Sequence, residues 1–134
     1  MIPKYRAWST FKNEWVKHFY ITESGLIYNM EQPHRDLIGA VPVEKSGLIL
    51  MQSTGLFDKN GVEIFEGDVV RHIDFYLNSE TVNKVYFKDG SFMYDVVVDE
   101  YVYDVPIGKI IENSMVEVIG NIYENQDLIE SVET

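Results

Sequence analysis

The chain has 134 residues, of which 46% are hydrophobic and 13% aromatic, so it is long enough and apolar enough to fold as one domain or as two small subdomains. It has no cysteine, which excludes disulfide bonds and thiolate chemistry and fits a reducing cytoplasm. The net charge of −11 is unevenly distributed along the chain. Residues 1–45 carry 6 Lys+Arg and 5 Asp+Glu, whereas residues 46–134 carry 5 Lys+Arg and 17 Asp+Glu. A chain this acidic is repelled by the phosphate backbone of a nucleic acid.

Residues 1–30 are predicted to form two or three strands. The segment 4–8 is short and extended, and Glu14 to Ile21 alternates with bulky side chains on both faces, which predicts one strand covered on both sides. A turn signal at Glu23-Ser24-Gly25 predicts that residues 26–28 return as the second strand of a hairpin.

The segment from Glu31 to Glu44 contains Pro33, Gly39 and Pro42, and prolines remove donors from a strand ladder. It is predicted to be a long loop with one helical turn near residues 35–38. We place the boundary here, with an N-terminal β subdomain and loop in residues 1–45 and a second subdomain in residues 46–134.

The stretch from Leu50 to Val70 is dense in turn signals. A buried strand is predicted at Leu48 to Met51, followed by bends at Thr54-Gly55, at Asp58 to Gly61 and at Glu66 to Asp68. Asp58-Lys59-Asn60-Gly61 fits a type I turn with a glycine bulge, since Asp accepts from the backbone two residues on and Gly tolerates a left-handed conformation. Glu66-Gly67-Asp68-Val69-Val70 is typical of the entry to a small SH3-like barrel.

The remaining chain is predicted to continue as a meander. Strands are expected at residues 69–76, 82–88, 91–98 and 99–105, with a type I′ turn at Asp89-Gly90. Residues 110–114 form a helical turn or a strand end, and residues 115–123 form a last strand with a bulge at Gly120. Asn125 is expected to cap a helix over residues 126–132. The predicted fold is therefore mainly β (β-rich α+β), with an N-terminal β subdomain, a small SH3-like β-barrel and a short C-terminal helix.

Four blocks of the sequence resemble the YopX family of phage and prophage proteins. They are Met51-Gln52-Ser53-Thr54-Gly55-Leu56, Asp58-Lys59-Asn60-Gly61, Ile64-Phe65-Glu66-Gly67-Asp68-Val69 and Val118-Ile119-Gly120-Asn121-Ile122-Tyr123-Glu124-Asn125. Arg6-Ala7-Trp8 also resembles the family's opening, so the likeness extends from residue 6 to residue 125. The resemblance implies a phage-associated, largely β protein and carries over no catalytic residue.

Little in the sequence indicates chemistry. The histidines His18, His34 and His72 are too far apart for a local zinc motif. One acidic cluster could in principle hold Mg²⁺ or Ca²⁺ or act as acid and base, but its members are better explained as turn and solvent-facing residues. The cluster comprises Asp58, Glu63, Glu66 and Asp68. We therefore expect no enzyme activity, no cofactor, no metal and no small-molecule substrate.

The chain has more aromatic residues than one inner barrel face can bury, so some must be exposed, where tyrosines commonly make interfaces. We predict a non-enzymatic accessory protein of the bacterial host cytoplasm that binds a protein, itself included as a homo-oligomer. No apolar stretch is long enough to span a membrane. The predicted interaction surface comprises Tyr76, Tyr86, Tyr94, Tyr101 and Tyr103.

Two alternatives remain open. The N-terminal part mixes basic and aromatic residues in a way that suits a nucleic-acid strand, although the net charge argues against it. These residues are Arg6, Trp8, Lys12, Trp15 and Lys17. The weaker alternative is a metal-dependent enzyme that uses the acidic cluster of residues 58–68, which requires its carboxylates to converge in a pocket.

Overall fold

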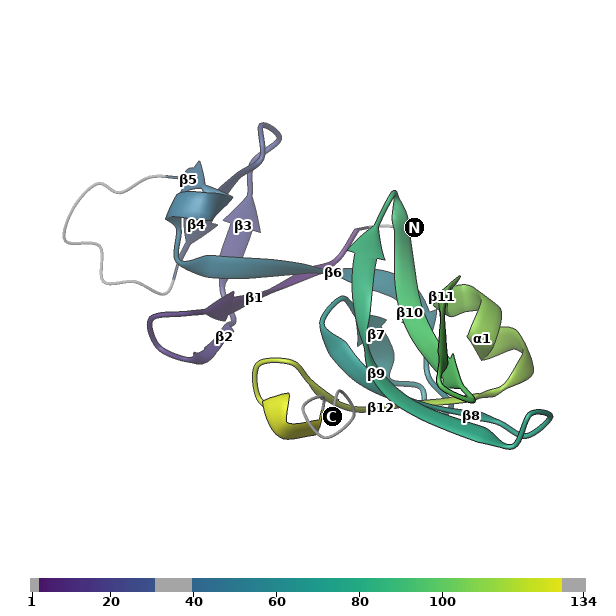
Figure 1. Ribbon diagram of the computed structural model, residues 1–134. Helices are drawn as coiled ribbons and strands as arrows, with labels where there is room; N and C mark the ends of the chain where they lie inside the picture. The colour runs from purple at the N-terminus through teal and green to yellow at the C-terminus, as the bar shows by residue number, and fades with distance from the viewer. Residues whose placement is uncertain (1–2, 31–39, 129–134) are drawn as a thin grey trace. The chain divides into compact units, whose positions relative to one another are not determined.

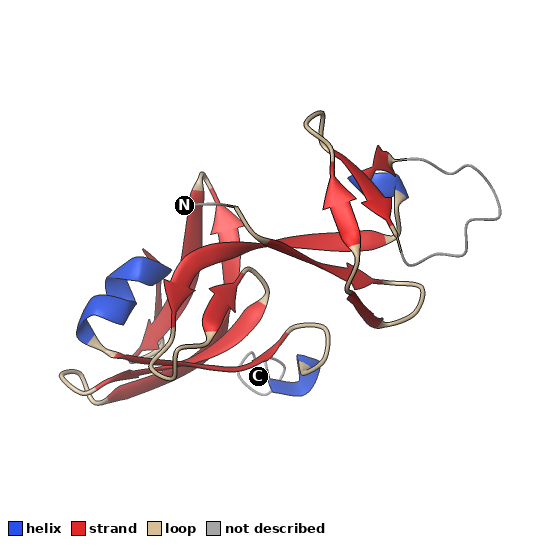
Figure 2. Ribbon diagram, turned by 180° about the vertical axis from the view of Figure 1, so that it is seen from behind, coloured by secondary structure: helices blue, strands red, loops and turns tan. Residues whose placement is uncertain are grey.

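The computed structural model describes residues 3–30 and 40–128, and within these ranges the chain is mainly β, which confirms the predicted fold class (Figure 1). The strands form two compact units, one of residues 4–52 and one of residues 1–3 and 53–134. The helices are short, as the colouring by secondary structure shows (Figure 2).

The unit of residues 4–52 contains two small antiparallel sheets. In one, β1 lies between β2 and β6, and in the other, β4 lies between β3 and β5. Ala7, Val16, Ile27 and Leu48 form its buried core. The elements are β1 (Tyr5–Ser9), β2 (Glu14–Val16), β3 (Phe19–Ile21), β4 (Leu26–Asn29), β5 (Val41–Pro42), the 3-10 helix η1 (Val43–Lys45) and β6 (Leu48–Phe57).

The single strand predicted for residues 14–21 is wrong. The chain breaks at Lys17-His18 into β2, which pairs with β1, and β3, which pairs with β4. Residues 14–21 have bulky side chains on both faces because the first part of the segment packs in one sheet and the second part in the other. The predicted hairpin turn at residues 23–25 is confirmed, with Gly25 at φ +86° and the Gly25 N–H donating to Thr22 O.

The predicted loop of residues 31–44 contains structure at its end. Pro42 belongs to β5, an edge strand, where a missing N–H donor is tolerated. The predicted helical turn at residues 35–38 lies outside the described residues.

The second unit is built on a five-stranded antiparallel sheet of order β11-β10-β9-β8-β12, which curls in Figure 1. Helix α1 contacts β10, β11 and β12, and its residues Ile107 and Ile110 join a core around Tyr94. The elements are β7 (Glu63–Phe65), β8 (Asp68–Asp74), β9 (Ser79–Lys88), β10 (Ser91–Val98), β11 (Tyr101–Pro106), α1 (Ile107–Asn113) and β12 (Met115–Asn121). The description as an SH3-like barrel stays a prediction.

Strand β6 is longer than predicted. Residues 48–52 pair with β1, and the later part of the strand pairs with β7, so the division between the two units falls inside this strand. The bend predicted at Thr54-Gly55 is instead an irregularity within β6, where the pairing register shifts between Ser53 and Phe57 and Gly55 has φ +77°. A bulge bends a strand without ending it.

Three tight turns connect consecutive strands: β6 to β7, β9 to β10 and β10 to β11. Asp58 to Gly61 closes the β6–β7 hairpin as predicted, with the Gly61 N–H donating to Asp58 O and Gly61 at φ +79°. Asp89-Gly90 is the predicted two-residue turn, with φ of +52° and +82°. A second two-residue turn, Asp99-Glu100, has φ of +50° and +72° and separates β10 from β11, although residues 99–100 were predicted as strand.

The end of the described chain is shaped by Asn125. The predicted bulge lies beside Gly120, because the β12–β8 register shifts between Val118 and Gly120. Residues 126–128 are helical, and the rest of the predicted C-terminal helix lies outside the described residues. The Asn125 side-chain oxygen accepts from the Asn121 N–H at 3.2 Å, and a Cβ at Gly120 would lie 2.5 Å from that oxygen.

Gly120→Ala is therefore expected to destabilise the protein by about 1–3 kcal/mol. The added methyl group would overlap the whole Asn125 side chain, from Cβ to Oδ1, and rotating the Asn125 amide alone would not relieve this overlap. Gly108→Ala is the matched control, since its Cβ would meet Leu56 Cδ1 at an ordinary 3.6 Å within α1. Urea unfolding followed by circular dichroism measures both, and equal stabilities of the two variants would contradict the expectation.

Candidate functional site

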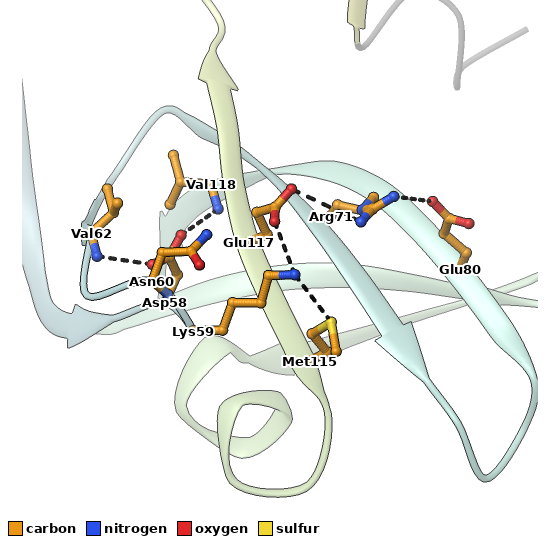
Figure 3. A network of polar contacts seen from close by, with 9 residues as sticks. All are labelled: Asp58, Lys59, Asn60, Val62, Arg71, Glu80, Met115, Glu117 and Val118. Carbon is orange, nitrogen blue, oxygen red and sulfur yellow. Dashed lines mark hydrogen bonds and ion pairs between the residues drawn. The ribbon is translucent and has the colours of Figure 1, made fainter.

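The carboxylate of Asp58 is the centre of the most connected polar site in the second unit (Figure 3). Asp58 Oδ1 accepts from the N–H groups of Asn60 and Val62, both at 2.8 Å, and Oδ2 accepts from the Val118 N–H at 2.8 Å. The Lys59 N–H donates to Val116 O at 3.0 Å. The turn is thus bonded to β12, and Asp58 is buried by these contacts.

The electrostatics of this turn favour a charged carboxylate. Burial by itself would raise the pKa of Asp58, but the backbone donors of Val118, Val62 and Asn60, together with the Lys59 ammonium, lower it below its ordinary value. The Lys59 Nζ also lies 3.1 Å from a Glu117 carboxylate oxygen, and Arg71 connects Glu117 with Glu80. These charged side chains span β12, β8 and β9 in Figure 3.

Gly67 connects the central stretch both to β9 and to the C-terminal block that carries the family resemblance. The Gly67 N–H donates to Val85 O at 2.8 Å, and the Ile122 N–H donates to Gly67 O at 2.9 Å. Asn121 Oδ1 accepts from the N–H groups of Tyr123 and Glu124. The motif residues of the central stretch and of the C-terminal block therefore hold each other in place, which is an architectural role.

The acidic cluster does not converge into a chemical site. Glu63 accepts a hydrogen bond from the Ser53 hydroxyl, whereas Asp68 Oδ2 accepts from the Phe65 N–H at 2.7 Å, so the two carboxylates bind different partners. Among the described residues, no group of three or more His, Cys, Asp or Glu side chains is placed to hold a metal ion. The metal-dependent alternative has no arrangement to support it there.

A buried Ser–His pair escaped the sequence analysis because its partners are far apart in the chain. His72 Nε2 lies 2.8 Å from Ser114 Oγ, and the Ser114 hydroxyl donates to Ile110 O. The hydroxyl proton is thus used, so His72 Nε2 carries a proton and donates it to Ser114. His72 is buried with its ring against Tyr94, and its Nδ1 meets no hydrogen-bond partner among the described residues.

This pair cannot act as a nucleophile and base. The serine proton points away from the imidazole, and the buried ring is out of reach of a substrate. Burial lowers the pKa of His72 below its ordinary value, with Asp74 opposing the shift. The pair is a structural contact between β8 and the end of α1.

The structure separates the five tyrosines predicted as an interaction surface. Tyr94 is fully buried, and its hydroxyl lies 2.8 Å from Val70 O and 2.9 Å from Thr81 O, so placing it on a surface was wrong. Tyr86 is half-buried and donates to Asp95. Tyr76, Tyr101 and Tyr103 are exposed, the first on the β8–β9 loop and the other two on β11.

The β8–β9 loop presents a larger apolar group than the sequence analysis assigned to it. Phe75, Tyr76 and Leu77 are 70%, 98% and 58% exposed, and the loop projects from the end of the sheet (Figure 1). Asp74 Oδ1 accepts from the N–H groups of Tyr76 and Leu77, and Asn78 takes φ +51°. The sequence signal for this exposed group is a run of three apolar residues between two turn-forming residues, Asp74 and Asn78. We call residues 75–77 the apolar tip.

The basic and aromatic residues of the N-terminal unit are partly used within it. The Trp8 and Trp15 rings meet edge to face at 5.1 Å, and the Arg6 guanidinium carbon lies 4.6 Å from the Trp15 ring centre. Trp8 is buried, so its ring has no free face for a base. Lys12 is exposed in the β1–β2 turn, and Lys17 is exposed between β2 and β3. Nucleic-acid binding by this set stays a prediction.

Comparison with known proteins decides the family. The YopX protein family model matches residues 4–130. The chain belongs to the YopX family. A segment of 72 residues is 35% identical to the SPbeta prophage-derived protein YopX of Bacillus subtilis strain 168, and this match spans 54% of each chain, about half the length of that relative. The family is phage-associated, as the resemblance implied.

Two crystal structures share the fold. Protein EF1440 from Enterococcus faecalis superposes with a TM-score of 0.61 at 29% identity, covering 96% of this chain and 99% of that one. YopX from Bacillus subtilis superposes with a TM-score of 0.62 at 23% identity, covering 92% and 95%. Neither comparison names an activity. Within the described part of this YopX-family chain, no helix is long and apolar enough to cross a membrane.

Asp58→Asn is expected to destabilise the protein by about 2 kcal/mol at neutral pH, because an amide nitrogen then faces a backbone donor. Asp89→Asn, in an exposed turn that suits asparagine, is the matched control. The pKa of Asp58 is lowered on folding, so its stabilisation is present above about pH 3.8 and is lost as the pH falls through the folded value. The stability difference should therefore shrink in acid. A difference independent of pH, measured by urea unfolding, would contradict this role.

The lowered pKa of His72 predicts a separate loss at milder acidity. Below about pH 6.5 the unfolded chain takes up a proton that buried His72 resists, so stability should fall with decreasing pH by up to about 1.4 kcal/mol per pH unit. His72→Gln should flatten the profile below pH 6.5, whereas His18→Gln leaves His72 in place and should keep it. An unchanged slope in His72→Gln would refute the assignment.

Proposed function

We propose that this chain is a phage- or prophage-encoded accessory protein of the bacterial cytoplasm that works by binding a protein and performs no catalysis. One observation carries the proposal. The apolar tip exposes three large side chains on a loop whose backbone is fixed by Asp74 and Asn78.

Exposed apolar side chains cost solubility, and a cluster of them commonly marks a contact site. Because the loop is already shaped by its own hydrogen bonds, binding loses little conformational entropy. Aromatic anchors such as Phe75 and Tyr76 are the residue types that dominate interface energies when they enter a pocket. The tip therefore suits an apolar pocket on another protein.

The charge around the tip restricts the partner. Residues 53–134 carry 5 Lys+Arg against 17 Asp+Glu, so a basic surface is attracted while an anionic membrane is repelled. A second copy presents its own acidic unit or the nearly balanced residues 4–52. Self-association would therefore use the N-terminal unit of the second copy, and light scattering detects it.

The test is capture from host cells that carry the phage or prophage. The tagged protein is compared with a Tyr76→Ser/Leu77→Ser variant, and truncation of two anchors is expected to cost about 2 kcal/mol of binding, roughly 30-fold in Kd. Phe57→Ser, at an exposed phenylalanine of β6, is the control and should keep the partner. Light scattering of the pure protein shows whether that partner is a second copy.

Two results would overturn the proposal. One is equal capture of the partner by wild type and by the tip variant. The other is a monomeric wild-type protein that captures nothing from these cells.

A further inference from the structure

The two edges of the five-stranded sheet differ in how their backbone groups are used. At the β12 edge, the Asp58–Gly61 turn accepts from the Val118 N–H and donates to Val116 O, so this edge is covered. At the β11 edge, the outward groups meet no hydrogen-bond partner among the described residues. Unpaired edge groups are a template for another strand.

The register shows which groups point outward. Val98 pairs with Tyr101 across the two-residue turn, so these two residues exchange both backbone hydrogen bonds. The pattern alternates along an antiparallel pair, so Tyr103 and Val105 also bond inward to β10. The N–H and C=O groups of Val102 and Asp104 therefore face the open edge. Pro106 has no N–H and ends this row of donors.

The side chains of β11 differ on its two faces. Tyr101, Tyr103 and Val105 lie on the face that Val98, Val96 and Tyr94 direct toward the core, because directly paired residues share a face. Tyr101 and Tyr103 are nevertheless 69% and 53% exposed, so the apolar face is left uncovered at its last strand. An added strand would cover them.

The opposite face places two carboxylates directly beside each other at this edge. Asp104 lies directly across from Asp95 in the β10–β11 pair, and like charges in that position destabilise a sheet. The Tyr86 hydroxyl donates to Asp95 Oδ1 at 2.5 Å. Burial, this hydrogen bond and the charges of Asp95 and Asp104 together raise the pKa of Tyr86 to about 12. A cation beside Asp104 would relieve the repulsion.

We propose that β11 accepts an extended segment of a partner protein as an additional strand, with basic residues beside Asp104 and apolar residues over Tyr101 and Tyr103. This partner chemistry rests on the proposed binding function and specifies it. Backbone pairing with Val102 and Asp104 supplies the affinity, and the alternation of side chains supplies the specificity. A second copy of β11 is a poorer occupant, because it brings another Asp104 and another proline to the same edge.

The experiment uses the full chain and a short blocked peptide that alternates lysine and valine, titrated by calorimetry. Control peptides have glutamate in place of lysine, or N-methyl groups on the amides of one edge. We expect binding of the lysine peptide only, weakened by salt. Asp104→Lys should weaken it by roughly tenfold, whereas Glu23→Lys makes the same change in net charge and should not. Val102→Pro should weaken it by roughly tenfold through the lost donor while retaining the folded circular dichroism spectrum.

Three outcomes would overturn the proposal. The first is that the N-methylated peptide binds as tightly as the unmodified lysine peptide. The second is that the Asp104→Lys variant binds the lysine peptide as tightly as wild type does. The third is that the protein forms a dimer that excludes the peptide and that dissociates when β11 is substituted. Peptide binding to β11 does not involve the apolar tip. If the peptide does not bind but the tip variant still loses the captured partner, only the inference about β11 is rejected. Loss of tip-dependent capture with peptide binding intact rejects only the tip as the carrier of the proposed function.

Discussion

The second unit depends on one buried carboxylate. Asp58 accepts three backbone hydrogen bonds, two from its own turn and one from Val118 in β12. Bonds to a charged acceptor are the stronger kind, and leaving their donors unpaired after burial is costly. The same contact closes a hairpin and fixes the last strand beside it. The stretch that is densest in turn signals therefore connects a hairpin to the last strand of the sheet.

This accounts for why the most distinctive residues of the chain indicate no chemistry. Gly67 bonds to both Val85 and Ile122, which brings a central bend, a strand and the C-terminal block together. Acidic and glycine residues recur through the central stretch, but Asp58, Gly61 and Asp68 are used by the backbone nearby. Among the described residues of this unit, the most exposed large apolar side chains lie elsewhere, on the apolar tip and on β11.

Local turn chemistry was predictable from the sequence. Asp58 to Gly61 and Asp89-Gly90 form as expected, because a short acceptor and a residue that tolerates positive φ suffice to specify them. The bond from Asp58 to Val118 was not predictable, since it spans 60 residues and depends on the sheet order. The same holds for the tyrosines. Tyr94 and Tyr103 have similar sequence surroundings, yet β10 is internal and β11 is at the edge. The turn at Asp99-Glu100 lacks the glycine that would have signalled it.

The covered edge of β12 and the proline at the end of β11 also bear on stoichiometry. A sheet that is open on both sides can grow without limit by adding chains, as fibres do. Here the Asp58 turn occupies one side and Pro106 shortens the other. Once a partner strand occupies the β11 edge, this sheet has no second open edge to which another chain can add. Growth through this sheet would stop at a one-to-one complex.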